Sequence, residues 1–280
     1  MGLGCNAVGV TGCRIIDSPR ERLVAVLTNN FMPCNGRFPM LIAILLIFFP
    51  AKGAAGSAAT APLLTGLIAL GVGATLLISR VLSDTLLKGE ASFFALELPP
   101  YRVPRVGSVL VRSLLDRTLF VLGRAAAVAA PAGLVIWLLA NVRAGDASLL
   151  AHASGALDPF ARLLGLDGVI LLAFILGLPA NEIVLPVVLM AYTAQNTLIE
   201  PGAPAALTAL LTDNGWTWLT AACTMIFCLM HWPCSTTCLT IRRETGSWKW
   251  TALAAAIPTL SGILLCALLA GIVRAMGWGA

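Results

Sequence analysis

The chain has 280 residues, of which 59% are hydrophobic and 11% are charged, and its mean hydropathy is +0.91. Soluble domains carry about 25% charged residues, so this composition excludes an ordinary water-soluble domain, and lipid is the expected solvent. The net charge of +5 reflects basic clusters at 14–22, 80–124 and 242–249. Such clusters are typical of cytoplasmic loops in membrane proteins, and no nucleic-acid partner is expected. We therefore predict an all-α polytopic membrane protein.

Residues 1–52 are predicted to be the last part of a first membrane-embedded half, and this part contains a broken helix. The basic stretch 14–22 is expected in the cytoplasm. The apolar run 40–49 is too short to cross a bilayer alone, and it follows a polar stretch that contains Pro33 and Pro39. We expect one helix interrupted between these prolines, which reaches the far side near Lys52.

The next two predicted regions are a transmembrane helix over 53–90 and a basic cytoplasmic connection over 91–118. The helix contains the apolar run 61–82, and prolines at 99, 100 and 104 break the connection. Residues 108–116 are expected along the membrane surface, and the basic side chains of 80–117 could dock a nucleotide-binding partner. The apolar run 119–140 then opens a second half that extends over 119–280.

Within this second half, 167–194 predicts a re-entrant hairpin and 216–240 a broken helix. The sequence 177–182 splits the first segment into two pieces too short to span. The following loop, 195–215, lacks Lys and Arg, whereas 242–249 is strongly basic. A hairpin keeps the basic loop inside, whereas a full crossing would place it outside, so the hairpin is preferred. The run 251–273 then crosses once more.

Asn181 and Glu182 form the first candidate site, in the sequence 178–186. A carboxylate between two apolar halves is costly in lipid unless it is paired or hydrated. Proline lacks an N–H, so Pro186 and Pro179 are expected to leave the carbonyls of Glu182 and Ile175 free for a cation. The alternative is a Glu at a hairpin tip that reaches the interface.

His231, Cys234 and Cys238 form the second candidate site. Spacings of three and four place them on one helix face, and Pro233 is expected to free the carbonyl of Leu229. Imidazole and thiolate ligands suit borderline metals such as Fe(II). The alternative is that these cysteines are small packing residues.

Cys5 and Cys34 form the third candidate, because each lies beside an asparagine and a glycine where backbone can approach an ion. Arg37 follows closely and is expected to anchor the loop. The other cysteines, 13, 223, 228 and 266, are assigned to packing. A disulfide framework is not expected in a large membrane chain.

No phosphate-binding loop, dinucleotide fingerprint or zinc-protease motif is present, and the two histidines do not form a recognisable catalytic arrangement. No catalytic residue, no bound cofactor and no enzymatic activity are therefore predicted. The chain begins abruptly, without a signal peptide, which suggests a fragment or a split gene.

Several of these stretches resemble the membrane region of the ferrous iron transport protein B (FeoB) family. They are GCNAVGVTGCR (4–14), NFMPCNGRFP (30–39), LPANEIV (178–184) and HWPCSTTC (231–238), and ELPPYRVP (97–104) is similar to the family's cytoplasmic connection. The resemblance covers nearly the whole chain. It implies Gate-type halves with broken helices, and Fe(II) as an ion transported across the bacterial inner membrane.

The family usually carries an N-terminal GTP-binding domain, which this sequence lacks, so GTP hydrolysis is not transferred to it. Either a GTP-binding domain or subunit is supplied separately, or the chain is a truncated product that cannot transport alone. Small cytosolic Feo-type accessory proteins and a homo-oligomer are further expected partners. Two alternatives stay open: a Gate-type permease for an organic solute such as a nucleoside, and a non-transporting scaffold or thiol sensor.

Overall fold

The structure is a computed structural model that describes residues 2–49, 56–87, 106–112, 120–145, 147–193 and 204–277. The described chain is almost entirely helical, which confirms the predicted all-α class. A short antiparallel hairpin joins β1 (Arg143–Ala144) to β2 (Ala147–Ser148). The helices are α1 (Asn6–Gly12), η1 (Cys13–Ile15), α2 (Pro19–Thr28), η2 (Asn29–Phe31), α3 (Phe38–Phe48), α4 (Gly56–Asp84), α5 (Val106–Arg112), α6 (Phe120–Asn141), α7 (Leu149–Leu163), α8 (Gly168–Leu176), η5 (Asn181–Ile183), α9 (Val184–Thr193), α10 (Pro204–Asp213), α11 (Trp218–Met230), α12 (Ser235–Thr245) and α13 (Trp248–Ala275).

Three helical stretches within the described residues are long and apolar enough to cross a bilayer. They are Thr60–Asp84 in α4, Trp218–Thr245 across α11 and α12, and Trp248–Ala275 in α13. Large apolar side chains are exposed on α4 and α13, for example Leu76 and Leu264, as expected of surfaces in contact with lipid. The chain is a membrane protein with several apolar helices, and its orientation in the bilayer stays a prediction.

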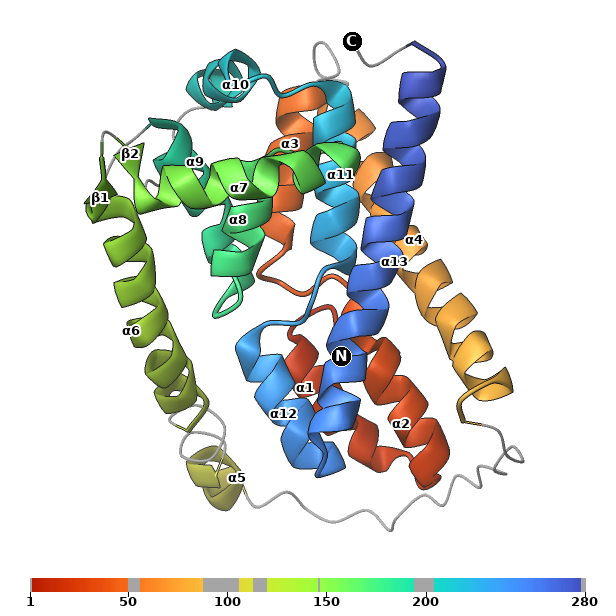
Figure 1. The fold of residues 1–280 in the computed structure, drawn as a ribbon. Helices are drawn as coiled ribbons and strands as arrows, with labels where there is room; N and C mark the ends of the chain where they lie inside the picture. The colour runs from red at the N-terminus through yellow and green to blue at the C-terminus, as the bar shows by residue number, and fades with distance from the viewer. Residues whose placement is uncertain are drawn as a thin grey trace.

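Helix α7 lies across the other helices and turns sharply into α8 (Figure 1), with an angle of 109° between the two. Gly168 permits this corner, because a Cβ there would lie only 1.9 Å from the carbonyl oxygen of Ser154. The Asp167 side chain caps α8 by accepting a 2.6 Å hydrogen bond from the Ile170 N–H. No helix was predicted in the α7 segment.

The predicted loop 195–215 contains a helix, α10, and this part of the prediction was wrong. Pro204 supplies the first residue of α10, where its missing N–H costs nothing, and the following residues are mostly alanine and leucine. The part of the loop before α10 lies outside the described residues. Most of the predicted connection 91–118 also lies outside them, apart from α5.

Helix α8 is followed by a short non-helical stretch, η5 and α9, and α8 packs against α9. Helix α11 ends at Met230, and α12 begins at Ser235 after a break at His231–Cys234. These interruptions fall within the predicted segments 167–194 and 216–240. The division into regions 1–52, 53–90, 91–118 and 119–280 stays a prediction, as does the re-entrant placement of the hairpin.

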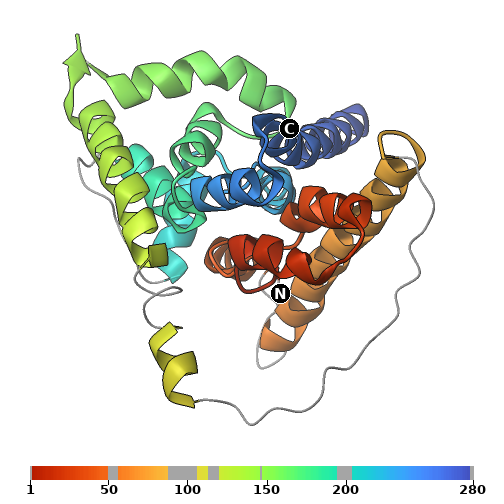
Figure 2. The ribbon, with the colours of Figure 1, turned by 90° about the horizontal axis from the view of Figure 1, so that it is seen from below.

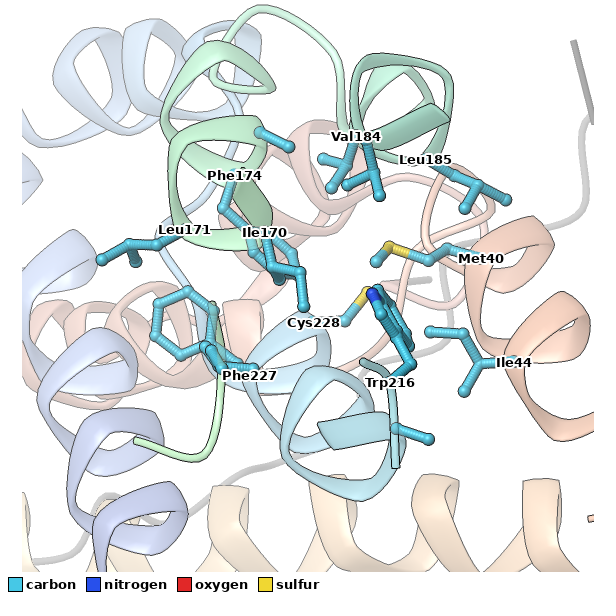
Figure 3. Close-up of a cluster of buried hydrophobic side chains, with 14 of the residues drawn as sticks. Met40, Ile44, Ile170, Leu171, Phe174, Val184, Leu185, Trp216, Phe227 and Cys228 are labelled. Atoms are coloured by element: carbon cyan, nitrogen blue, oxygen red, sulfur yellow. The ribbon is translucent and has the colours of Figure 1, made fainter. Parts of the chain in front are cut away.

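The largest hydrophobic core lies between α3, α8, α9 and α11 (Figure 3), where Phe174 meets Phe227 edge-on at 5.0 Å between ring centroids. Seen from below, α1 and α2 lie between α4 and α12 (Figure 2). The helix breaks described next lie between this core and the group formed by α1, α2 and α12 (Figure 1). The fold therefore brings polar, non-helical backbone to the middle of an apolar molecule.

Candidate cation site at the helix breaks

Side chains from three breaks in the chain meet in the interior. The Asn181 amide, in η5, donates from Nδ2 to the Cys34 thiol at 3.7 Å. Its Oδ1 lies 3.3 Å from Nε2 of His231. Asn181 and His231 are 8% and 1% exposed, and Cys34 is 9% exposed. One residue from each of the three predicted candidate sites therefore takes part in a single buried cluster.

Backbone hydrogen bonds fix the same breaks to one another. The Ser235 N–H, at the start of α12, donates to the Leu178 carbonyl at 2.8 Å. The Asn30 side chain, in η2, donates to the His231 carbonyl at 2.7 Å. Because buried peptide groups need partners, these bonds satisfy the backbone where the helices stop. They also hold the three interruptions in one place.

The His231 ring is oriented by a backbone carbonyl and by a neighbouring aromatic ring. Nδ1 lies 2.9 Å from the Cys228 carbonyl, and the ring packs 4.9 Å from Phe174 between centroids. A histidine whose Nδ1 is engaged with a carbonyl presents Nε2 to its surroundings, which is the usual arrangement of a metal-ligating histidine. Here Nε2 is directed at Asn181.

Glu182 lies beside this cluster with its side chain packed over Gly36. A Cβ added at Gly36 would be 3.1 Å from Glu182 Cγ and 3.4 Å from Oε1. Unlike Asn181, Glu182 is exposed. Its carboxylate is therefore held next to the Cys34 turn, on the accessible side of the break.

The remaining predicted ligands do not take part in these contacts. The Cys234 thiol lies 3.2 Å from the Thr237 hydroxyl, and the Cys238 thiol donates to the Pro233 carbonyl at 3.5 Å. Cys5 is exposed at the N-terminal end of α1. In the part of the chain that the structure describes, no group of three or more His, Cys, Asp or Glu side chains could hold a metal ion together. Metal binding by these residues stays a prediction.

Two carbonyls expected to be free have partners, so this part of the sequence analysis was wrong. The Ile175 carbonyl accepts a 3.2 Å hydrogen bond from the Leu178 N–H, which closes a tight turn after α8. The Leu229 carbonyl accepts a 2.8 Å hydrogen bond from the Arg37 guanidinium. Proline removed the helical donor in each case, and a nearby donor replaced it.

Arg37 anchors its loop, as predicted, and it does so from a fully buried position with 0% exposure. Besides Leu229 it bonds the carbonyls of His231 and Asn30, at 3.2 and 2.9 Å. Asn30, which the sequence analysis did not select, is 2% exposed and contacts both Arg37 and His231. The signal available in the sequence was a pair of adjacent asparagines before Pro33 in otherwise apolar surroundings.

Comparisons with known proteins show which family the chain belongs to. The family described as "Ferrous iron transport protein B C terminus" matches residues 64–116, and the Gate family, described as "Nucleoside recognition", matches residues 122–248. The Fe(2+) transporter FeoB of Staphylococcus aureus (strain COL) is 31% identical over 276 residues, which is 95% of this chain and 38% of that relative. The chain belongs to the ferrous iron transport protein B family.

More distant FeoB relatives cover the chain to a similar extent. A Fe(2+) transport protein A/Fe(2+) transporter FeoB fusion protein of Porphyromonas gingivalis (strain ATCC BAA-308 / W83) is 25% identical over 89% of this chain and 34% of its own length. The Fe(2+) transporter FeoB of Leptospira interrogans (strain 56601) is 23% identical over 88% of this chain and 38% of its own length. The chain thus spans well under half the length of these relatives. No solved structure matches it.

The Gate match covers most of the predicted ligands. Its residues 122–248 include Asn181, Glu182, His231, Cys234 and Cys238. Cys5 and Cys34 precede both matched regions. The buried cluster therefore joins the Gate-matched part of the chain to its N-terminal helices.

Proposed function

We propose that the chain is the membrane permeation part of a ferrous iron importer in the bacterial inner membrane. The relatives that match 95% of the chain are named Fe(2+) transporters. The observation that supports the proposal within this chain is the buried contact of Cys34, Asn181 and His231 across three helix breaks. Broken helices that carry polar side chains into an apolar interior are the usual binding sites of transporters.

The side chains of the cluster suit Fe²⁺ as the transported ion. A thiol and an imidazole favour borderline first-row metals over Mg²⁺ and Ca²⁺, and an amide and a carboxylate supply oxygen. We propose that the ion is bound along its path by Cys34, Asn181, Glu182 and His231. Cys234, Cys238 and Cys5 would provide further contacts at the ends of α12 and α1.

Cys234, Cys238 and Cys5 lie apart from the buried cluster, and a path with separate contacts suits transit better than retention. Conduction requires sites that bind strongly enough to attract an ion and weakly enough to release it. A compact cluster of three strong ligands would hold Fe²⁺, whereas one or two ligands at each step allow it to move on. We therefore propose successive contacts in place of one closed metal site, and no resident cofactor.

Coupling to energy would come from a GTP-binding domain or subunit, which acts on the basic segment 80–117. An Feo-type accessory protein is a further proposed partner, since one relative is a fusion of Fe(2+) transport protein A with FeoB. A homo-oligomer is the third proposed association. Each of these proposals concerns the complete transporter and its assembly in the membrane.

Anaerobic Fe²⁺ uptake by cells that express the complete transporter tests the proposal. Glu182→Gln and Cys34→Ser each remove one ligand, and we expect both to lower the initial rate of uptake by roughly tenfold, or about 1.4 kcal/mol. Asp213→Asn, on the exposed end of α10, and Cys13→Ser are matched controls that should leave uptake unchanged. Unchanged uptake by both ligand variants, at equal protein levels, would remove this cluster from the ion path.

A second candidate is a permease for a nucleoside-like solute, which the description of the Gate match favours. Such a site would rely on hydrogen-bonding amides and aromatic rings, and Asn181, Phe174 and Trp232 surround His231. Competition decides between the two candidates. Inhibition of Fe²⁺ uptake by Mn²⁺ but not by a nucleoside supports iron transport, and nucleoside uptake that is insensitive to Fe²⁺ supports the second candidate.

A further inference from the structure

Arg37 carries a positive charge in the interior without a carboxylate partner. It lies directly before α3, its side chain is 0% exposed, and no ion pair among the described residues includes it. Charged side chains are almost never fully buried unless they are paired, because transfer of an isolated charge from water is very costly. The Arg37 guanidinium must therefore be stabilised in another way.

Neutral oxygen atoms provide that stabilisation. Nη1 donates to the carbonyls of Asn30 and Leu229 at 2.9 and 2.8 Å. Nη2 donates to the Asn30 side-chain oxygen at 3.2 Å, and to the carbonyls of His231 and Trp232 at 3.2 and 3.4 Å. Of the three guanidinium nitrogens, Nε alone has no partner among the described residues. One cation is thus surrounded by five uncharged oxygens.

The group of oxygen atoms around the Arg37 guanidinium is chemically similar to a cation-binding site. Selectivity filters coordinate cations with rings of backbone carbonyls, and transporters use the carbonyls at unwound helix segments for the same purpose. Here the break after α11 directs the carbonyls of Leu229, His231 and Trp232 to one point, and the guanidinium occupies that point. An exposed arginine, such as Arg243 on α12, has no such environment.

We propose that the Arg37 guanidinium occupies a site formed by carbonyl oxygens that would otherwise bind a free cation. Removal of its charge turns the same oxygens into a site for a free ion. As a second consequence, which rests on the proposed function, the fixed charge keeps the transported ion away from these carbonyls. The ion is thereby directed to the side chains of Cys34, Asn181, Glu182 and His231, and Arg37 acts as a positioning residue.

Thermal unfolding of the purified protein, followed by tryptophan fluorescence at one scan rate, tests the first statement. In a buffer with choline as the only abundant cation, we expect Arg37→Met to lower the apparent melting temperature by about 5 °C or more. KCl or NaCl should restore most of this loss. The wild type and Arg243→Met should respond to neither salt. A stable Arg37→Met protein, or a loss that no cation reverses, would overturn the proposal.

A second pair of variants keeps the proposal testable if Arg37→Met does not fold. Arg37→Lys keeps the charge and three donors, whereas Arg37→Gln has an amide of similar reach without charge. We expect the melting temperature of the lysine variant to be closer to that of the wild type than the melting temperature of the glutamine variant is. Added cations should not change the melting temperature of the lysine variant. A glutamine variant at least as stable as the lysine variant would contradict a role for the charge. No buffer contains iron, so these results are independent of whether the protein transports Fe²⁺.

Discussion

Nε2 of His231 lies 3.3 Å from the side-chain oxygen of Asn181, although 50 residues of sequence separate them. The contact joins the break after α11 to the break after α8. Both residues are buried, so each depends on the other for a polar neighbour in an apolar interior. This contact links the two breaks directly, so a change at one of them should affect the other.

Replacement of Asn181 by alanine should destabilise the protein. Asn181→Ala removes the amide donor to the Cys34 thiol and the polar neighbour of His231 Nε2, and an unsatisfied buried polar group costs about 1–3 kcal/mol. Thermal unfolding in detergent measures the effect. Asn214→Ala, which removes an exposed asparagine bonded to the Leu210 carbonyl, should cost much less. Equal losses in the two variants would show that the cluster does not depend on Asn181.

A side chain at Gly36 should displace Glu182 without unfolding the protein. The nearest atoms to a new Cβ belong to the flexible Glu182 side chain, with Cγ at 3.1 Å. We therefore expect Gly36→Val to lower Fe²⁺ uptake by roughly tenfold, or about 1.4 kcal/mol, with little change in melting temperature. Gly73→Ala, on α4 where nothing lies within 4 Å, is the matched control. Normal uptake by Gly36→Val would argue against a precise position for Glu182.

The Cys13 thiol should be alkylated slowly at neutral pH and faster as the pH rises. Burial raises its pKa, and the Glu244 carboxylate raises it further, so less of the reactive thiolate is present at a given pH. Glu244→Gln removes the electrostatic contribution, and it should accelerate alkylation of Cys13 at constant pH. The rate at Cys5, which is exposed, serves as the internal reference. No change in the ratio of the two rates would contradict this explanation.

Tyr192 should stabilise the hairpin formed by α8 and α9. Its hydroxyl donates to Asp167, the residue that caps α8, and it accepts a 2.8 Å hydrogen bond from the Trp216 indole. Tyr192→Phe removes both bonds and should cost about 1–3 kcal/mol, because the Asp167 carboxylate is left partly buried. A double-mutant cycle with Asp167→Asn measures the coupling. Strict additivity of the two substitutions would show that the pair does not act together.

The sequence was sufficient to predict the helical membrane class and the location of the breaks. Runs of apolar residues indicate spans, and prolines at 179, 186 and 233 indicate interruptions, since both signals depend only on neighbouring residues. Helices α7 and α10 were missed because they are shorter and less apolar than a span. The corner between α7 and α8 depends on Gly168, whose role is visible only once the two helices are placed together.

The partners of the candidate residues were harder to predict than their positions. Composition identified Cys34, Asn181 and His231 separately, but their meeting depends on how three breaks pack. The carbonyls of Ile175 and Leu229 were expected to face an ion. The structure assigns them to the Leu178 N–H and to Arg37, because a buried carbonyl takes the nearest available donor. Long-range contacts of this kind leave no periodic signal in the sequence.

Protection of Cys34 from a small, charged thiosulfonate reagent tests the central claim most directly. The measurement uses the complete transporter under anaerobic conditions, and mass spectrometry reports modification at Cys34 alone. If Fe²⁺ passes the cluster, Fe²⁺ should slow modification of Cys34 in the wild type, Mg²⁺ should not, and Glu182→Gln should weaken the protection. Modification at the same rate with and without Fe²⁺ would contradict the account.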